Sequence, residues 1–221
     1  MMNLKKTLKQ LGGNLIYRLK PGKAEYDRVV SIPAFHNLGP GDIAIDCGAN
    51  LGAITAVLAA GGAEVHAFEP NPDAYRILSA KVSNLPNVHL HQKAVLDKPG
   101  ILTLYLHVNY GRNPERFSSG SSLIAEKRNV DDRSGVDVKV IDFPAFVRGL
   151  GRPVKLLKVD IEGAEYILLN ALIDAGLMDR IEKVYVETHA HAIPSLKEAD
   201  RLLRLRLKTL GLTEKIDLNW V

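Results

Sequence analysis

Apolar residues occur along this chain in short runs, and most runs are followed by a stretch with helical spacing. In the first half this pattern predicts strand, helix, strand, helix and strand at residues 43–46, 53–60, 65–68, 72–82 and 88–95. The same rhythm returns later, with strands at residues 154–160 and 183–188 and helices at 164–175 and 195–210. We expect residues 212–221 to form one last strand.

Between these halves the apolar residues alternate with polar ones instead of running together. Residues 101–108 and 136–141 both alternate, which is typical of half-exposed strands, so we expect them to pair antiparallel. A long polar segment, residues 109–135, joins them, and loops of this length are usually functional or disordered. The chain as a whole therefore predicts an α/β fold: a mostly parallel, doubly wound sheet with an inserted β-hairpin.

Acidic residues stand at the ends of four predicted strands, namely Asp46, Glu69, Asp160 and Glu187. Right-handed crossovers place the carboxyl ends of parallel strands along one edge of a sheet, and ligands bind at that edge. We therefore expect the four carboxylates to surround one site.

The turn after the first strand indicates which ligand this site takes. Gly48, Asn50 and Gly52 lie between that strand and its helix, and the next strand ends in Glu69, which is the local order of a nucleoside pocket. A dinucleotide site would have a glycine where Asp46 stands. A carboxylate repels a pyrophosphate but attracts an ammonium group. Because S-adenosylmethionine carries an amino group and no phosphate, Asp46 favours it over NAD.

Composition separates the chain into two parts. Residues 1–38 form a basic segment with apolar residues at rough helical spacing, which we expect to pack on or cover the site. Weak contact of this segment with an anionic membrane surface is the alternative. Residues 39–221 form the cofactor-binding domain. The pattern fits neither a signal peptide nor a membrane span, and the single cysteine, Cys47, fits a packing role in a cytoplasmic protein. The sequence does not indicate an oligomeric state.

Four motifs give the chain a family resemblance. They are residues 40–52 (PGDIAIDCGANLG), 67–72 (AFEPNP), 120–123 (GSSL) and 157–165 (LKVDIEGAE). Together they resemble the FkbM family of S-adenosylmethionine-dependent methyltransferases, and the last motif is the most specific. The resemblance implies a class I methyltransferase, Rossmann-like fold and O-methylation of a sugar or natural-product hydroxyl. It also implies an antiparallel strand pair at the end of the sheet, for which few residues remain after Gly211.

The resemblance also implies roles for single residues. Asp46, Gly48, Asn50 and Gly52 would surround the methionine part of the cofactor, and Glu69 would bind the ribose. Independently of the resemblance, the positions of Phe68 and Pro70 beside Glu69 suggest that one of them packs on the adenine. The serine turn at residues 119–122 and Asp160 would lie near the transferred methyl group. The complete predicted cofactor site is Asp46, Gly48, Ala49, Asn50, Gly52, Glu69, Pro70, Ser121, Ser122 and Asp160.

The predicted catalytic residues are Asp160, Glu187 and His189. Residues two apart project alike from a strand, so Glu187 could orient His189 as the general base for a hydroxyl acceptor. His189 could equally be a surface residue, and Asp160 could instead cap the following helix. Glu162 could cap that helix or reach the substrate, and Glu165 suits its first turn. We predict no metal ligand, although Asp160, Glu187 and His189 would also suit one magnesium or calcium ion.

The long polar segment is the expected acceptor site. Its basic residues and serines suit a small-molecule or glycan acceptor. Nucleic acid is disfavoured because no aromatic cluster interleaves with the basic residues. The sequence thus predicts a methyltransferase that O-methylates a hydroxyl of a sugar, glycan or small natural product. The alternatives are a nicotinamide-dependent oxidoreductase, an RNA methyltransferase and a non-catalytic cofactor-binding protein.

Overall fold

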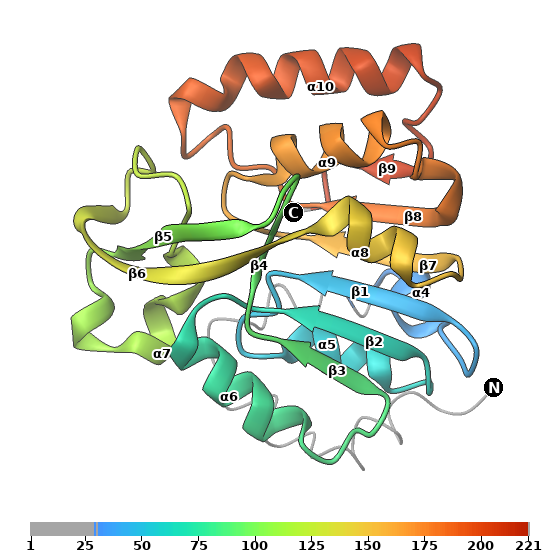
Figure 1. The fold of residues 1–221 in the computed structure, drawn as a ribbon, viewed down its shortest axis with the longest axis horizontal. Helices are drawn as coiled ribbons and strands as arrows, with labels where there is room; N and C mark the ends of the chain where they lie inside the picture. The colour runs from blue at the N-terminus through green and yellow to red at the C-terminus, as the bar shows by residue number, and fades with distance from the viewer. Residues whose placement is uncertain (1–28, 30, 221) are drawn as a thin grey trace.

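The computed structural model describes residue 29 and residues 31–220 (Figure 1). Most of the predicted basic segment, residues 1–38, lies outside the described residues. The part within them includes a short helix, α4 (Pro33–His36), which opens with a proline. In the described part of the chain no helix is both long enough and apolar enough to cross a membrane.

The main sheet has six strands, all of them parallel, in the order β3-β2-β1-β7-β8-β9. Their bounds are β1 (Ile43–Cys47), β2 (Glu64–Phe68), β3 (Val88–His91), β7 (Val154–Val159), β8 (Ile181–Val186) and β9 (Ile216–Asp217). The chain winds outward from β1 to β3 and then returns to β7 on the other side of β1. This reversal confirms the doubly wound α/β prediction and places a topological switch point between β1 and β7.

Helices cover both faces of this sheet, as the layers in Figure 1 show. α4, α5 (Ala53–Ala59) and α6 (Pro72–Val82) pack on one face. α8 (Phe143–Gly149), α9 (Glu165–Asp174) and α10 (Lys197–Thr209) pack on the other. All five residues of β1 are buried, because its side chains alternate between these two layers. Short 3-10 turns, η3 (Met178–Arg180) and η4 (Pro194–Leu196), precede β8 and α10.

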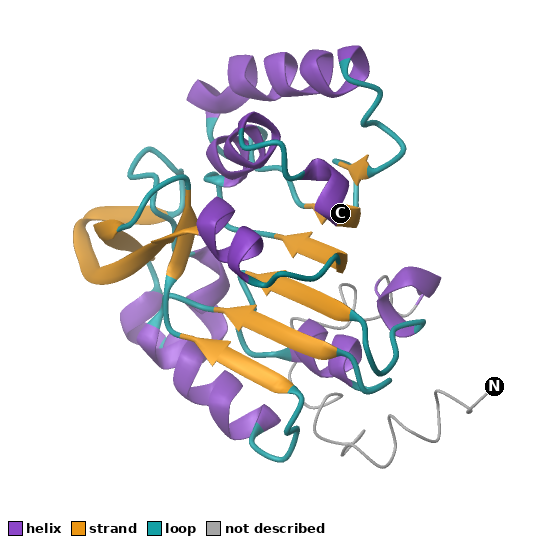
Figure 2. Cartoon of the chain, turned by 45° about the vertical axis from the view of Figure 1, so that its right-hand side comes forward, coloured by secondary structure: helices purple, strands orange, loops and turns teal. Residues whose placement is uncertain are grey.

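A second, three-stranded sheet stands at the carboxyl ends of the main strands, toward which their arrowheads point in Figure 2. It contains β4 (Ala94–Leu96), β5 (Gly100–His107) and β6 (Val130–Asp142) in the order β4-β6-β5. β5 and β6 pair antiparallel, which confirms the inserted hairpin. β4 pairs parallel with β6. The prediction of a single strand at residues 88–95 was wrong, because a tight turn in which Lys93 N donates to His91 O separates β3 from β4.

The polar segment 109–135 is more ordered than a loop. It contains η1 (Tyr110–Arg112), α7 (Pro114–Phe117), η2 (Ser118–Gly120) and the first residues of β6. α8 was not predicted, although Asp142 accepts a hydrogen bond from Ala145 N at 2.8 Å and marks its start as an N-cap.

The C-terminal edge also departs from expectation. The last predicted strand shrinks to the two residues of β9, which run parallel to β8. The antiparallel pair implied by the family resemblance is not present among the described residues.

Candidate active site

A cleft of about 650 Å³, including its open mouth, lies at the carboxyl ends of β1, β2 and β7. Ligands of doubly wound sheets bind at this edge, beside the topological switch point. The lining comes from the ends of these strands, from β4 and β5, and from the serine-rich turn around η2. The residues are Gly48, Asn50, Phe68, Glu69, Pro70, Asn71, Lys93, Ala94, Val95, Leu104, Ser118, Ser119, Ser121, Ser122, Leu123, Asp160, Ile161, Glu162 and Ala164.

Glu69, the first residue after β2, is held by the backbone on both of its oxygens. Oε2 accepts a hydrogen bond from Asn50 N and Oε1 accepts one from Asn71 N, each at 2.8 Å. Burial raises the pKa of this carboxyl to about 7, although the two backbone hydrogen bonds oppose the shift. Each carboxylate oxygen retains a lone pair, so Glu69 can still accept hydrogen bonds from hydroxyl groups in the cleft.

The turn after β1 lies tightly against the end of β7. Gly48 has φ +80°, and a Cβ atom there would lie only 1.7 Å from Asp160 O. A side chain is thus excluded at position 48 by both conformation and space. Asn50 also adopts a left-handed conformation and accepts a hydrogen bond from Ser118 Oγ at 2.8 Å. This bond joins the β1 turn to the serine-rich turn across the cleft.

Within the serine-rich turn, the four serines of the lining differ in their bonding. Ser122 Oγ donates to Glu162 O at 2.5 Å and fixes the turn to the segment after β7. Ser121 is buried, and its Oγ has no hydrogen-bond partner among the residues that the structure describes. Buried polar atoms are nearly always paired in native proteins, so Ser121 Oγ is a candidate ligand contact.

Asp46 lies behind the cleft and does not line it. It is fully buried and accepts a hydrogen bond from Thr55 Oγ1 at 2.7 Å. The β1–β7 register sets it beside Lys158, whose Nζ is 3.1 Å from Asp46 Oδ1. That contact is an ion pair whose geometry does not meet the criteria for a hydrogen bond. Lys158 Nζ also donates a hydrogen bond to Gly48 O at 2.6 Å. The Asp46–Lys158 pair therefore stabilises the turn after β1. Like Asp46, the predicted cofactor residues Ala49 and Gly52 are not among the residues that line the cleft.

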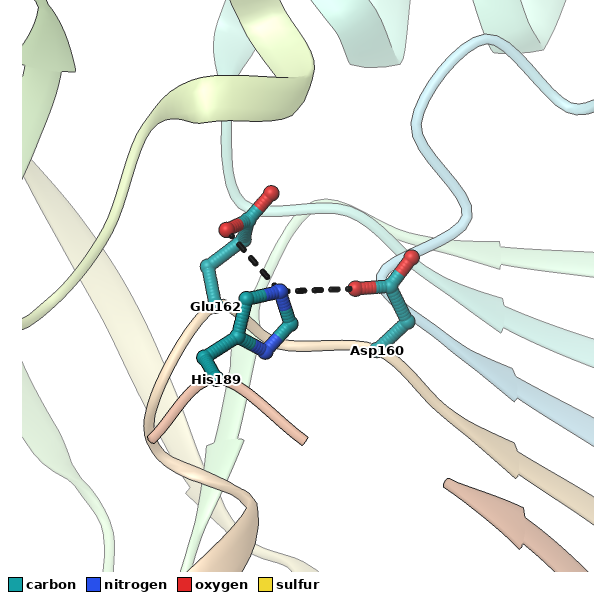
Figure 3. Close-up of side chains that lie close together, drawn as sticks. All are labelled: Asp160, Glu162 and His189. Atoms are coloured by element: carbon teal, nitrogen blue, oxygen red, sulfur yellow. Dashed lines mark ion pairs between the residues drawn. The ribbon is translucent and has the colours of Figure 1, made fainter. Parts of the chain in front are cut away.

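His189 lies among four carboxylates, two of which are shown with it in Figure 3. Its Nε2 is 3.2 Å from Glu162 Oε2, and 3.8 Å from both Asp160 Oδ1 and Glu187 Oε1. On the other side of the ring, Nδ1 is 3.3 Å from Glu165 Oε1, which also accepts a hydrogen bond from His189 N at 2.8 Å. The structure thus brings together all three predicted catalytic residues, and His189 is buried rather than on the surface.

The carboxylates shift the protonation of this group. Burial alone would lower the pKa of His189, but hydrogen bonds and charge from Glu162 and Glu165 outweigh it and raise the pKa to about 11. The pKa of Glu187 is raised to about 7, mainly by burial and then by the charge of Asp160. Burial likewise raises the pKa of Asp160, with Lys158 opposing. In this arrangement the neutral imidazole that a general base requires is disfavoured.

The structure decides the alternatives left open for three acids. Asp160 does not cap α9, whose N-cap is Ala164 and has no side-chain hydrogen bond. Glu165 is the first residue of α9, as predicted. Glu162 does not cap α9: it lines the cleft, adopts φ +58° and makes an ion pair with the buried Lys127.

Comparison with known proteins gives the chain a family. The model of the methyltransferase FkbM domain matches residues 46–211, which is most of the chain. The chain belongs to the FkbM methyltransferase family. It is therefore a methyltransferase, and the alternatives of an oxidoreductase and of a non-catalytic protein fall away. Comparison with curated proteins gave no match.

Solved structures resemble this FkbM methyltransferase only distantly. An rRNA methylase from Streptococcus thermophilus is 15% identical, covers 86% of this chain and 80% of its own, and has a TM-score of 0.42. Precorrin 8w decarboxylase from Methanobacterium thermoautotrophicum is 15% identical over 84% and 71%, with a TM-score of 0.45. A protein from Streptococcus mutans, described as a methyltransferase and crystallised in complex with SAH, is 13% identical over 87% and 82%, with a TM-score of 0.40.

Two lysines of this FkbM methyltransferase had no role in the prediction. Lys158 carried a signal: it is a charged residue among apolar neighbours near the end of its strand, and the predicted strand at residues 43–46 ends in Asp46. Lys127 carried none, because it lies in a polar segment with several other basic residues. Only the fold shows that Lys127 is buried and donates to Gly120 O at 3.0 Å as well as to Glu162.

Proposed function

We propose that this FkbM methyltransferase uses S-adenosylmethionine to methylate a hydroxyl group of a sugar, glycan or other small hydroxylated molecule. The observation that carries the proposal is the placement of carboxylates along one cleft. Glu69 lies at the end of β2, and Asp160 and Glu162 lie after β7. One end thus suits a ribose, and the other suits a group that loses a proton.

The lining residues fit the cofactor. Glu69 is fixed by two backbone N–H groups and can accept hydrogen bonds from vicinal hydroxyls. Ser121 Oγ is buried and has no hydrogen-bond partner in the described part of the chain, so it can bond to the cofactor. The cleft carries the carboxylates of Glu69, Asp160 and Glu162 against one lysine, Lys93, so it favours a cofactor with a net positive charge.

Asp46 supports the cofactor differently from our expectation. We predicted that its carboxylate meets the amino group of the cofactor, but its partner in the fold is Lys158. We now propose that Asp46 acts through the turn. By fixing Lys158, which donates to Gly48 O at 2.6 Å, it holds the Gly48–Asn50 backbone in place.

S-adenosylmethionine supplies a methyl group on a positively charged sulfur, and its C–S bond breaks with the electron pair moving to sulfur as the acceptor oxygen forms the new C–O bond. The chain's contribution is to align the acceptor, exclude water and take up the hydroxyl proton. We propose that Asp160, Glu187 and His189 form the catalytic group. Asp160 faces the cleft, Glu187 adjoins it, and His189 fixes the positions of both carboxylates.

Calorimetry with S-adenosylhomocysteine tests the cofactor site. Glu69→Gln keeps the shape but weakens acceptance of ribose hydroxyls, so we expect about tenfold weaker binding, the value of one charge-assisted hydrogen bond. Glu64→Gln, at the opposite end of the same strand, is the matched control and should bind as the unmodified protein does. Absence of S-adenosylhomocysteine binding in the unmodified protein would overturn the proposal.

A screen of acceptors then tests the substrate class. Purified protein with S-adenosylmethionine is offered sugars, glycolipids, polyketides and RNA, and formation of S-adenosylhomocysteine is measured. We expect turnover with a hydroxylated small molecule or glycan. Turnover with RNA alone, falling steeply as salt is raised, would replace that acceptor with a nucleic acid.

A further inference from the structure

We propose that Asp160, Glu162 and His189 bind one divalent cation of the magnesium or manganese type, with Glu187 close enough to complete the site. The ion would lie at the acceptor end of the cleft. The catalytic role of this ion rests on the proposed function, whereas its binding depends only on the side chains around it.

The spacing of the donor atoms suits a single ion. One ligand atom from each of Asp160, Glu162 and His189 lies within 4.8 Å of the others. Two ligands at about 2.1 Å from one ion lie about 3.0 Å apart when adjacent and about 4.2 Å apart when opposite. The separations from His189 Nε2, 3.2 Å to Glu162 Oε2 and 3.8 Å to Asp160 Oδ1, fall within this interval (Figure 3).

The orientation of His189 points to a cation on its Nε2 side. Glu165 is fully buried, accepts a hydrogen bond from His189 N, and lies 3.3 Å from Nδ1. A carboxylate there holds a proton on Nδ1 and directs Nε2 toward Glu162 and Asp160. Without an ion these two carboxylates also favour a proton on Nε2; a divalent cation would replace that proton and take the Nε2 lone pair as a ligand. This carboxylate–histidine pair is the usual outer support of a metal-binding imidazole.

The local charge leaves room for such an ion. Four carboxylates, Asp160, Glu162, Glu165 and Glu187, lie within 4 Å of the His189 ring nitrogens. Two buried lysines adjoin the group: Lys127 contacts Glu162, and Lys158 is 3.6 Å from Asp160 but is shared with Asp46. Counting Asp46 as well, five carboxylates against two ammonium groups and the His189 imidazolium leave two negative charges when all the acids are ionised.

The donor set also indicates the kind of metal. Carboxylate oxygens dominate, which suits magnesium and manganese, whereas the single imidazole favours manganese among hard cations. Thiolate ligands are absent from the group, and the one cysteine, Cys47, is buried elsewhere. Because Asp160 and Glu162 line the cleft, open coordination positions would face the acceptor. An acceptor hydroxyl bound there would lose its proton more readily to a carboxylate of the group, and its oxygen would then attack the methyl group as the C–S bond breaks.

Manganese binding to the full chain, freed of metal by a chelator, tests the proposal. Mn²⁺ is titrated and free ion is followed by electron paramagnetic resonance, with and without S-adenosylhomocysteine. We expect one site per chain, and at least tenfold weaker binding in Glu162→Gln. Glu198→Gln, an exposed acid on α10 paired with Arg201, removes one negative charge away from the site and should leave the affinity unchanged. Glu187→Gln serves as a second variant if Glu162→Gln does not fold.

The outcomes separate the two proposals. Binding of S-adenosylhomocysteine without any Mn²⁺ binding at millimolar concentration overturns the metal site and leaves the methyltransferase proposal intact. Equal Mn²⁺ affinity in Glu162→Gln and Glu198→Gln also overturns it. Metal binding without S-adenosylhomocysteine binding supports the site and overturns the proposed function. In the supported case, Mn²⁺ also broadens the His189 ring resonances.

Discussion

Replacing Lys158 with methionine should destabilise this protein more than any other single loss of charge in the main sheet. The side chain of Lys158 is 1% exposed and faces Asp46, which is fully buried. Methionine fills a similar volume but leaves the Asp46 carboxylate without its counter-ion and Gly48 O without its donor. Breaking a buried pair by removing one partner costs about 3–5 kcal/mol in the free energy of unfolding. For a chain of this length, at about 2–4 °C per kcal/mol, that corresponds to a fall in Tm of about 6–20 °C.

Urea denaturation followed by circular dichroism measures this loss. Lys155→Met is the matched control, since Lys155 lies on the same strand and pairs with Glu182 in solvent; its denaturation midpoint should not move. The double variant Asp46→Asn with Lys158→Met removes both charges and should recover part of the stability, because a neutral pair carries no uncompensated charge. If Lys158→Met is no less stable than Lys155→Met, the pair does not support the turn and our account of Asp46 is wrong.

Three further predictions follow from the same structure. Gly48→Ala should lower the free energy of unfolding by at least about 2 kcal/mol and abolish S-adenosylhomocysteine binding, because its Cβ atom would lie 1.7 Å from Asp160 O at a positive φ. Thermal denaturation measures the first effect and calorimetry the second, and an unchanged Tm would refute the prediction. Burial, then the nearby His66, lowers the pKa of His91 to about 4. The folded state thus disfavours protonation of His91, so the free energy of unfolding should fall by about 1–2 kcal/mol as pH drops from about 6.5 to 4, after allowance for partial exposure. His91→Gln should flatten that part of the stability–pH curve, and an unchanged curve would show that His91 does not cause the loss. Tyr110→Phe removes hydrogen bonds of 2.9 and 2.7 Å to the first turn region of α6 and should cost about 1 kcal/mol in urea denaturation, whereas no change would show that η1 does not stabilise that helix.

The main sheet could be predicted because its signals are local. Strands buried on both faces read as apolar runs, and Pro72 and the glycines mark helix boundaries. The break between β3 and β4 could not be predicted in the same way. Residues 88–95 keep a high β-propensity throughout, and only pairing with β6, far along the chain, draws Ala94–Leu96 into another sheet. The start of β6 was missed for the same reason, since Val130 and its neighbours read as polar loop.

In the candidate site, the sequence predicted which residue types gather but not their partners. Asp160, Glu187 and His189 do come together, as the strand ends implied. Glu165, however, supports His189 from a helix that follows a different strand, and Lys127 reaches Glu162 from the segment between η2 and β6. Such contacts depend on the distance between elements and on side-chain direction, which periodicity does not encode.

The acids at the strand ends divide into two kinds for a physical reason that the structure makes plain. Asp46 is the fourth residue of a five-residue strand, so its side chain points into the helix layer, where it needs Thr55 and Lys158 as partners. Glu69, Asp160 and Glu187 each follow the last residue of a strand, so they stand at the edge and keep some exposure to a ligand. A shift of two positions along the strand therefore separates an acid that stabilises the fold from an acid that can take part in chemistry. Substituting an acid of the first kind should be read out first as lost stability, and one of the second kind as lost binding or turnover in a protein that remains folded.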